Sequence, residues 1–350
     1  MRAGPKHRLI AAGFAALAAS RADRLLAPFA RGRGVILMFH HVRPTRPDPF
    51  RPNALLEITP DYLDTVLSTV RRAGYDLVAL DEVPGRLATG GRPFAALTFD
   101  DGYRDNVEYA LPVLERHGAP WTLFVTADYA SGCGRLWWLE LEEVVRRSGT
   151  LALDEGGATR VLPAATPEEK HAAFAAAYAN LRSGPEERLR NTILSWCQAA
   201  RVDGAELVRS LCLGWHDLAD LARRPGVTIG AHTLTHPMLA KHDRAAVERE
   251  IAVGGAAIAQ RLGVEVRHLS YPVGDPTSAG PREFAMAREA GFATAVTTRP
   301  GHLYPEHLDH LTALPRVSVN GLHQSEAAFR SLLSGVPFLL WNRGRRLNVD

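Results

Sequence analysis

The sequence predicts an α/β fold, a parallel sheet or barrel interrupted by a mostly helical insertion. Short apolar runs typical of buried strands alternate with helical patterns in the first third of the chain, and such runs return after residue 225. Between these two regions helical periodicity replaces the strand pattern. We therefore expect a barrel over residues 35–130 and 225–320, an insertion over 131–224 and a C-terminal tail over 321–350.

The predicted strands are short and apolar throughout, as in parallel sheets that are covered on both faces. They are residues 35–39, 77–80, 95–99, 121–125, 227–231, 268–271 and 293–296. His40 directly follows the first of these strands, and Asp100 and Asp101 follow the third. Since parallel α/β folds carry their chemistry at the carboxyl ends of strands, these side chains are candidates for a functional site.

Helices are predicted between the strands and through the insertion. Thr59 is a plausible N-cap with Pro60 at the first helical position, and a second helix follows the Asp-Asp-Gly segment through Leu114. In the insertion, helical patterns cover residues 137–145, 167–181 and 185–200.

Residues 1–34 allow two interpretations. Basic residues precede an alanine-rich apolar stretch over residues 9–20, which resembles a weak secretory signal. Apolar residues also recur at helical spacing beyond that stretch, and we favour an amphipathic helix for this reason. No apolar run reaches 18 residues, so no transmembrane span is expected, while peripheral contact with a membrane stays open.

Composition indicates an ordinary globular protein. The 350 residues are 46% hydrophobic and 23% charged, and the net charge of +3 is too small to indicate nucleic-acid binding. Three scattered cysteines form neither a disulfide framework nor a CxxC metal motif. A cytoplasmic location is favoured on this basis, envelope or secreted locations stay open, and the oligomeric state is not indicated.

The first motif that carries chemistry is TFDDGY, residues 98–103. Two adjacent carboxylates repel one another unless a cation neutralises them, because like charges this close raise one pKa. With a metal present, one carboxylate can bind it while its neighbour acts as a general base. The alternative is an ordinary turn, for which Asp-Asp-Gly is a common composition.

The second motif is HTLTH, in which His232 and His236 follow another predicted strand. Two histidines at i and i+4 share a face if the segment is helical, and both can then reach one metal. Two surface histidines are the alternative. Together with a carboxylate, the pair would form a ligand set with open positions, as in catalytic rather than structural zinc sites.

The order of these motifs resembles that of the polysaccharide deacetylases, the NodB-homology family of carbohydrate esterases that includes chitooligosaccharide deacetylases. Residues 36–40 resemble the opening strand of the family, and LSYPVG, residues 269–274, resembles its third motif. The resemblance covers roughly residues 35–130 and 225–320 and leaves out the insertion. It implies a distorted (β/α) barrel with fewer than eight strands.

The resemblance also implies roles for individual residues. Asp100 would be the general base, and Asp101, His232 and His236 would bind a divalent metal, commonly zinc. A backbone N–H near Val273, in the segment that also holds Tyr271 and Pro272, would hold the oxyanion. The implied substrate is an acetylated glycan, from which N-acetyl or O-acetyl groups are removed.

The sequence departs from the family pattern at two points. Ser270 stands where many members have an arginine that orients the catalytic aspartate, and Arg316 is a candidate replacement. The family's last motif usually supplies a histidine general acid. His323 is suggested for this role by Leu322-His323, and His40 is a second polar candidate near the site.

Two other functions stay open at this stage. One is a different metal-dependent hydrolase on the same barrel that cleaves the C–N bonds of small cyclic amides. The other is a catalytically inactive carbohydrate-binding homologue, which the intact Asp-Asp and His-His motifs argue against.

Overall fold

The computed structural model describes residues 5–349. Its strands are β1 (Gly34–Phe39), β2 (His41–Val42), β3 (Glu57–Ile58), β4 (Asp76–Val78), β5 (Phe94–Phe99), β6 (Trp121–Val125), β7 (Thr150–Asp154), β8 (Thr159–Pro163), β9 (Val227–Ala231), β10 (His268–Ser270), β11 (Thr294–Pro300) and β12 (Leu314–Ser318). Its α-helices are α1 (Pro5–Ala19), α2 (Ala22–Ala30), α3 (Pro60–Arg72), α4 (Val83–Thr89), α5 (Leu111–Arg116), α6 (Ala127–Ala130), α7 (Trp137–Arg147), α8 (Pro167–Ser183), α9 (Glu186–Ala200), α10 (Gly204–Leu211), α11 (Trp215–Ala222), α12 (Arg244–Glu248), α13 (Gly254–Leu262), α14 (Pro281–Glu289), α15 (Glu326–Leu333) and α16 (Val336–Trp341).

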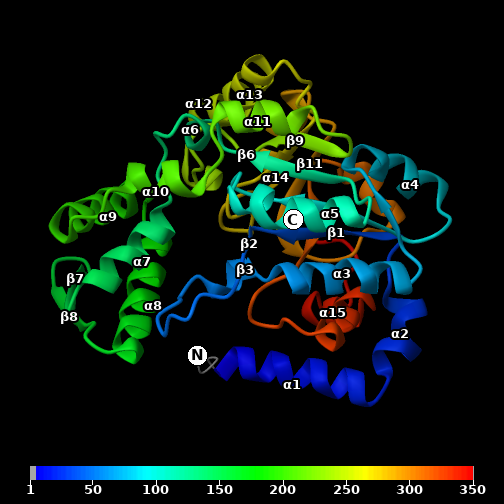
Figure 1. The fold of residues 1–350 in the computed structure, drawn as a ribbon, viewed down its shortest axis with the longest axis horizontal. Coiled ribbons are helices and arrows are strands. Elements are labelled where there is room, and N and C mark those ends of the chain that lie inside the picture. The colour runs from blue at the N-terminus through cyan, green and yellow to red at the C-terminus, as the bar shows by residue number, and fades with distance from the viewer. Residues whose placement is uncertain (1–4, 350) are drawn as a thin grey trace.

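Seven parallel strands close into a barrel surrounded by helices (Figure 1). Their order is β1-β12-β11-β10-β9-β6-β5, and β5 pairs with β1 along six residues to complete the ring. The short β4 adds to β5 outside the ring. The expectation of a distorted barrel with fewer than eight strands is confirmed.

The barrel is irregular on one side. There, β10 has three residues and shares a single registered pair with β9, Leu269 with Ala231. The register between β11 and β12 also shifts along their length. The opposite side is regular, because β1 pairs with β5 at six consecutive positions and β5 with β6 at three. This regular side holds the end of β5, where the Asp-Asp motif begins.

The predicted helix start at Thr59 is confirmed in detail. The Thr59 side chain accepts a hydrogen bond from the Tyr62 N–H at 3.1 Å, and Pro60 occupies the first turn, where the helix needs no N–H.

Helices near both ends of the described chain pack on one another. Helix α1 packs against α15, and α2 packs against α16. The prediction of a tail over residues 321–350 is wrong in this respect, because α15 and α16 bury Phe329, Leu333 and Phe338. The Asp23 carboxylate of α2 pairs with Arg330 of α15 at 3.1 Å and ties the two ends together.

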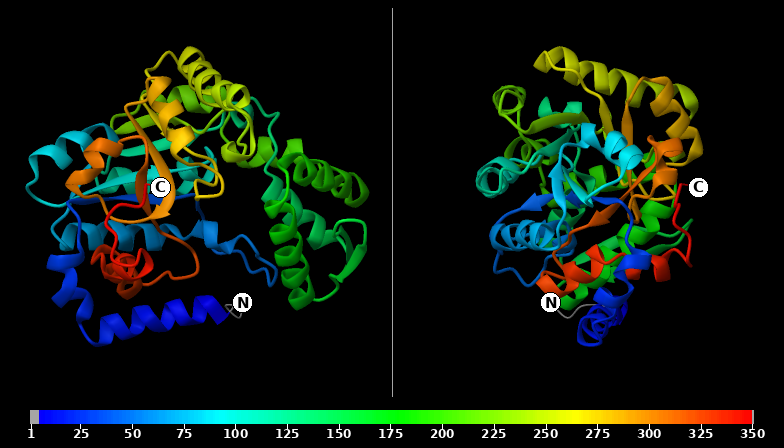
Figure 2. Two further views of the ribbon diagram at one scale, coloured as in Figure 1. Left: turned by 180° about the vertical axis from the view of Figure 1, so that it is seen from behind. Right: turned by 90° about the vertical axis from the view of Figure 1, so that its right-hand side faces the viewer.

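The insertion projects from one side of the barrel (Figures 1 and 2). Its helices α7, α8 and α9 pack on one another, and it also contains an antiparallel hairpin, β7–β8, that helical periodicity did not predict. Its apolar core continues into residues at the carboxyl end of the barrel, among them Tyr103 and Tyr129. The insertion is therefore packed against the end of the barrel where the predicted site lies.

Within the described part of the chain, we find no helix whose length and apolar character would allow it to cross a membrane.

Candidate active site

The Asp-Asp-Gly segment leaves β5 in a sharp turn that separates the two carboxylates. Asp101 has a φ of 70° and Gly102 a φ of 65°, so two consecutive residues adopt the left-handed region. Aspartate tolerates this region better than most residues, and glycine adopts it freely. Both aspartates are 2% exposed, yet their side chains meet different partners.

Asp100 is held by Arg316 of β12. The Arg316 guanidinium donates two parallel hydrogen bonds to the Asp100 carboxylate, at 2.8 and 2.7 Å, and a third at 3.0 Å to the Ser270 hydroxyl. Burial alone would raise the pKa of Asp100, but the charge and hydrogen bonds of Arg316 lower it below its ordinary value. Arg316 thus contacts Asp100 as expected of the arginine that orients this aspartate. The small Ser270 side chain contacts Arg316 at the same place.

Asp101 faces His232 and His236 instead. The Nε2 atoms of both histidines lie 3.4 Å from Asp101 Oδ1. Burial would raise the pKa of Asp101, but the neighbouring imidazoles of His232 and His236 hold it well below its usual range. The four residues of the two sequence motifs therefore converge at one place.

The two histidines reach this position from a loop. Residues 232–238 are not helical, and Thr233 and His236 have φ values of 65° and 62°. The helical geometry considered for HTLTH is therefore wrong. The two imidazoles nevertheless reach the same point, as that geometry would have allowed. The loop is fixed by the buried Glu250 carboxylate, which accepts hydrogen bonds from the N–H groups of Leu234 and Thr235.

The Asp101, His232 and His236 side chains have the composition and arrangement of a metal site. Their ligand atoms all lie within 4.8 Å of one another, and Asp101 Oδ1 is buried without a hydrogen-bond partner among the described residues. His232 Nδ1 donates to the Ser270 carbonyl at 2.7 Å, which leaves Nε2 with its lone pair toward the cluster. An unpaired buried carboxylate oxygen is costly, so a cation bound by these three side chains fits the site.

His40 lies beside Asp100. Its Nε2 atom is 3.9 Å from Asp100 Oδ2. Burial lowers the pKa of His40, although the charges of Asp100 and Asp101 act in the opposite direction. His40 is therefore a neighbour of the predicted base.

The third motif contributes its backbone. Val273 has a φ of 62°, which is unusual for a β-branched residue, and no hydrogen bond among the described residues engages its N–H. Pro272 accepts a hydrogen bond from the Gly274 N–H at 2.6 Å across this turn. Tyr271 instead packs against Phe284 of α14, and its hydroxyl donates to the Thr312 carbonyl at 2.8 Å.

His323 does not join the group, which contradicts the suggestion that it belongs to the site. Its ring packs edge-on against Phe14 of α1 with centroids 5.4 Å apart, and its carbonyl accepts a hydrogen bond from the Tyr62 hydroxyl. Leucine followed by histidine is too short a pattern to identify a site.

Two aromatic residues at the site were not predicted from the sequence. Tyr129 and Trp138 both lie against His236, with ring centroids at 5.8 and 5.0 Å from its ring. Trp138 comes from α7 of the insertion, is 6% exposed, and its Nε1 has no hydrogen-bond partner among the described residues. No pattern in the sequence connects this tryptophan to a histidine almost 100 residues later.

Comparison with known proteins agrees with this geometry. The sequence profile named polysaccharide deacetylase matches residues 88–153 and 158–295, which together make up more than half of the chain. The chain belongs to the polysaccharide deacetylase family. The match runs through most of the insertion, whereas the sequence resemblance was confined to the barrel. No curated protein sequence matches this deacetylase significantly.

Solved structures share its fold. The Streptococcus pyogenes deacetylase PplD, determined in complex with acetate, is 18% identical with a TM-score of 0.54, and the alignment covers 82% of this chain and 92% of PplD. The putative polysaccharide deacetylase BA0330 from Bacillus anthracis is 16% identical with a TM-score of 0.53, covering 86% of this chain and 68% of that one. IcaB from Ammonifex degensii is 17% identical with a TM-score of 0.50, covering 86% and 97%.

Family membership makes this deacetylase a hydrolase of carbon–nitrogen bonds other than peptide bonds. Its substrate class within the family is an acetylated glycan.

Proposed function

We propose that this protein is a metal-dependent deacetylase that hydrolyses the N-acetyl groups of an oligosaccharide or polysaccharide such as a chitooligosaccharide. One observation carries the proposal. An Asp-His-His group with an unpartnered carboxylate oxygen lies directly beside a second aspartate that an arginine orients. Amide hydrolysis requires a Lewis acid and a general base side by side, and this arrangement supplies both positions.

Asp101, His232 and His236 would hold the divalent ion, and three protein ligands with open positions favour zinc. When bound, the ion supplies Lewis-acid chemistry, polarising the acyl oxygen and making water more acidic.

Asp100 is the general base in this proposal. Its lowered pKa keeps it ionised near neutral pH, so that it can accept a proton from the attacking water. Arg316 fixes both carboxylate oxygens and thereby the direction of that transfer. The Val273 N–H is available to donate to the acyl oxygen as negative charge develops there.

The departing amine needs a proton. His323 packs against α1, and burial lowers the pKa of His40. We therefore assign the amine proton to Asp100, which carries the proton taken from water once the water has attacked. The two transfers balance, since the proton leaves water for Asp100 and then leaves Asp100 for the amine nitrogen.

Acetate release from a panel of acetylated glycans tests the proposal. Chitooligosaccharides, peptidoglycan fragments and an O-acetylated polysaccharide would be assayed with and without a chelator, followed by zinc replacement. D101A should lose both bound metal and activity, whereas D100N should keep the metal and lose roughly 10²–10⁴-fold in kcat, the usual contribution of a general base.

Two results would contradict the proposal. Activity that survives complete metal removal would exclude the metal-dependent mechanism. Ring-opening of small cyclic amides without acetate release from any glycan would favour the other hydrolase class.

A further inference from the structure

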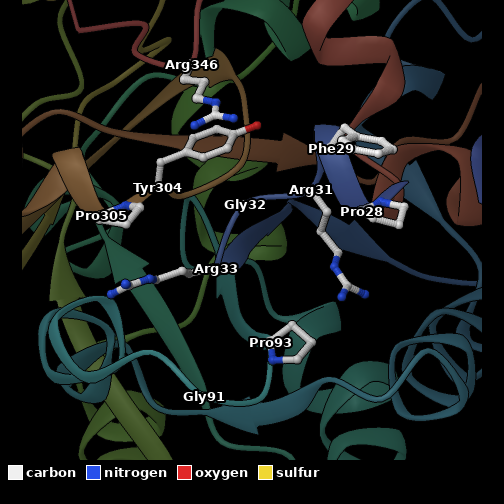
Figure 3. A pocket seen from close by; sticks show the side chains of 10 residues that line it. All are labelled: Pro28, Phe29, Arg31, Gly32, Arg33, Gly91, Pro93, Tyr304, Pro305 and Arg346. Atoms are coloured by element: carbon white, nitrogen blue, oxygen red, sulfur yellow. The ribbon is translucent and has the colours of Figure 1, made fainter. Parts of the chain in front are cut away.

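A second feature lies at the opposite end of the barrel from the active site. A cavity of about 440 Å³ opens where β1 and β5 begin, next to α2 and the segment after α16 (Figure 3). Asp100 follows the other end of β5, so this cavity is remote from the proposed chemistry.

Three arginines line this cavity. Arg31, Arg33 and Arg346 surround it together with Tyr304, and no acidic residue is among the lining residues. Within residues 5–349, none of the three guanidinium groups forms an ion pair. Arg346 lies over the Tyr304 ring at 5.3 Å (Figure 3). Arg31 lies over the Tyr75 ring at 5.6 Å. These ring contacts hold both side chains in position. Such a cluster fits a phosphate group.

Exposed apolar side chains lie on α2 and α16, the helices next to this cavity. On α2, Leu25 and Phe29 are 72% and 75% exposed and stand four residues apart, on one side of the helix. Helix α16 packs against α2, and its last residues Leu340 and Trp341 are 75% and 57% exposed. Phe29 itself lines the cavity, so the apolar stripe and the arginines form one continuous surface, which we call the α2–α16 face.

The excess of basic over acidic residues is concentrated in the first and last segments of the chain. Lysine and arginine exceed aspartate and glutamate by six in residues 1–34 and by two in residues 335–350. Because the whole chain carries +3, residues 35–334 have a net charge of −5. Residues 1–34 and 335–350 therefore carry a net charge of +8 between them, and their helices α2 and α16 pack on one another.

From these observations we infer that the α2–α16 face docks on an anionic membrane surface. Leu25, Phe29 and the end of α16 enter the boundary of the lipid layer, and the arginine-lined cavity receives a lipid phosphate. Apolar side chains beside a basic cluster are the pattern of peripheral proteins that lie on a membrane. Docking in this way leaves the active site, at the other end of the strands, open to a glycan.

Vesicle co-sedimentation of the full chain tests this inference independently of activity. Phosphatidylglycerol-containing vesicles should bind the protein, pure phosphatidylcholine vesicles should bind it much less, and added salt should weaken the binding. R31Q/R346Q should lower the partition coefficient roughly 30-fold, as expected for two arginines near an anionic surface. L25N/F29N should lower it as well.

A matched control is R160Q/V161N on β8 of the insertion, where Val161 is 61% exposed. This variant should bind vesicles like the wild type. Circular dichroism checks the fold of each variant. If L25N/F29N is unfolded, vesicle binding by R31Q/R346Q alone tests the inference. Equal binding of both lipids, or unchanged binding by both α2–α16 variants, would overturn the inference. The inference would also be overturned if the protein bound no vesicles and self-associated in a way that L25N/F29N abolished. The α2–α16 face would then be an interface with a second copy of this chain.

Discussion

The backbone conformation of Asp101 determines which partners both Asp100 and Asp101 meet. Its left-handed φ of 70° directs neighbouring carboxylates to different cations, Asp100 to a fixed guanidinium and Asp101 to the proposed metal. Without that turn the two carboxylates would share one environment, and the pKa of one would rise. The turn therefore lets both remain ionised while they perform different tasks.

The first prediction concerns the Asp100–Arg316 pair. R316M should lower kcat roughly 100-fold, because a misplaced base loses its alignment, while R316K should lose less. R316M should also cost roughly 3–5 kcal/mol of stability, since it leaves a buried carboxylate without its partner. Steady-state kinetics and urea unfolding measure both effects.

The D100N/R316M double variant is the control for this effect. Because the two residues contact one another, the double variant should be less destabilised than the sum of the single variants. Additive effects would show that the ion pair does not account for the loss.

The second prediction concerns His323. H323A should leave kcat and the pH profile within about twofold of the wild type, because the imidazole packs against Phe14 of α1. Acetate release over a range of pH measures this. A large loss of kcat at full metal content would restore His323 as the acid.

Among individual residues, the polar side chains of the site were predicted from the sequence, whereas the residues that pack around them were not. Asp100, Asp101, His232 and His236 could be recognised because they follow predicted strands, and parallel strands end at one edge. Tyr129, Trp138 and Glu250 could not, since their contacts depend on tertiary packing across the insertion and helices. Trp138 also carries no titratable group by which the sequence would mark it as a site residue.

Among the elements, the loop after β9 depends on a single carboxylate. Glu250 holds two N–H groups and the Thr235 hydroxyl, between the two histidines. The third prediction is that E250A lowers the affinity for zinc roughly 10–100-fold, the usual effect of losing the support of metal ligands. Competition with a chromogenic chelator measures it.

A matched control is available in Glu248, which lies two residues earlier and is exposed. E248A should leave zinc affinity unchanged. If E250A binds zinc as tightly as the wild type, the loop geometry does not depend on this carboxylate.

Strand prediction from the sequence succeeded for several strands and failed for β12. The segment 121–125 matches β6 at both ends, and 227–231 matches β9. β12 was not predicted as a strand, because Pro315 and a charged Arg316 are both unusual inside a sheet. The structure accommodates them since Arg316 is satisfied by five hydrogen bonds within the barrel.

At the scale of the whole molecule, barrel and insertion are joined by a segment that a buried carboxylate organises. Glu57 of β3 pairs with Arg43, Arg46 and Arg51 at 2.6 to 3.0 Å. Asn53, in the same segment, donates to Glu142 of α7. Burial would raise the pKa of Glu57, but its arginine partners lower it to about 2.

The fourth prediction follows from this shift. A folded-state pKa below the ordinary value stabilises the protein above pH about 4.5, and the stabilisation is lost as pH falls toward about 2. The contribution at pH 7 is about 3 kcal/mol by linkage. Urea unfolding of wild type and E57Q should therefore differ at pH 7 and converge under acid conditions. A difference that does not depend on pH would contradict this account.

The pairing of Asp100 with Arg316 spans 216 residues and joins β5 to the last strand of the barrel. During synthesis from the N-terminus, β5 is complete long before β12 exists. A nascent or truncated chain could carry every residue of the TFDDGY and HTLTH motifs and still have an undirected base. Catalytic competence in this protein should therefore appear only once the ring is complete, so that hydrolysis itself reports that β12 has been made and has joined the barrel.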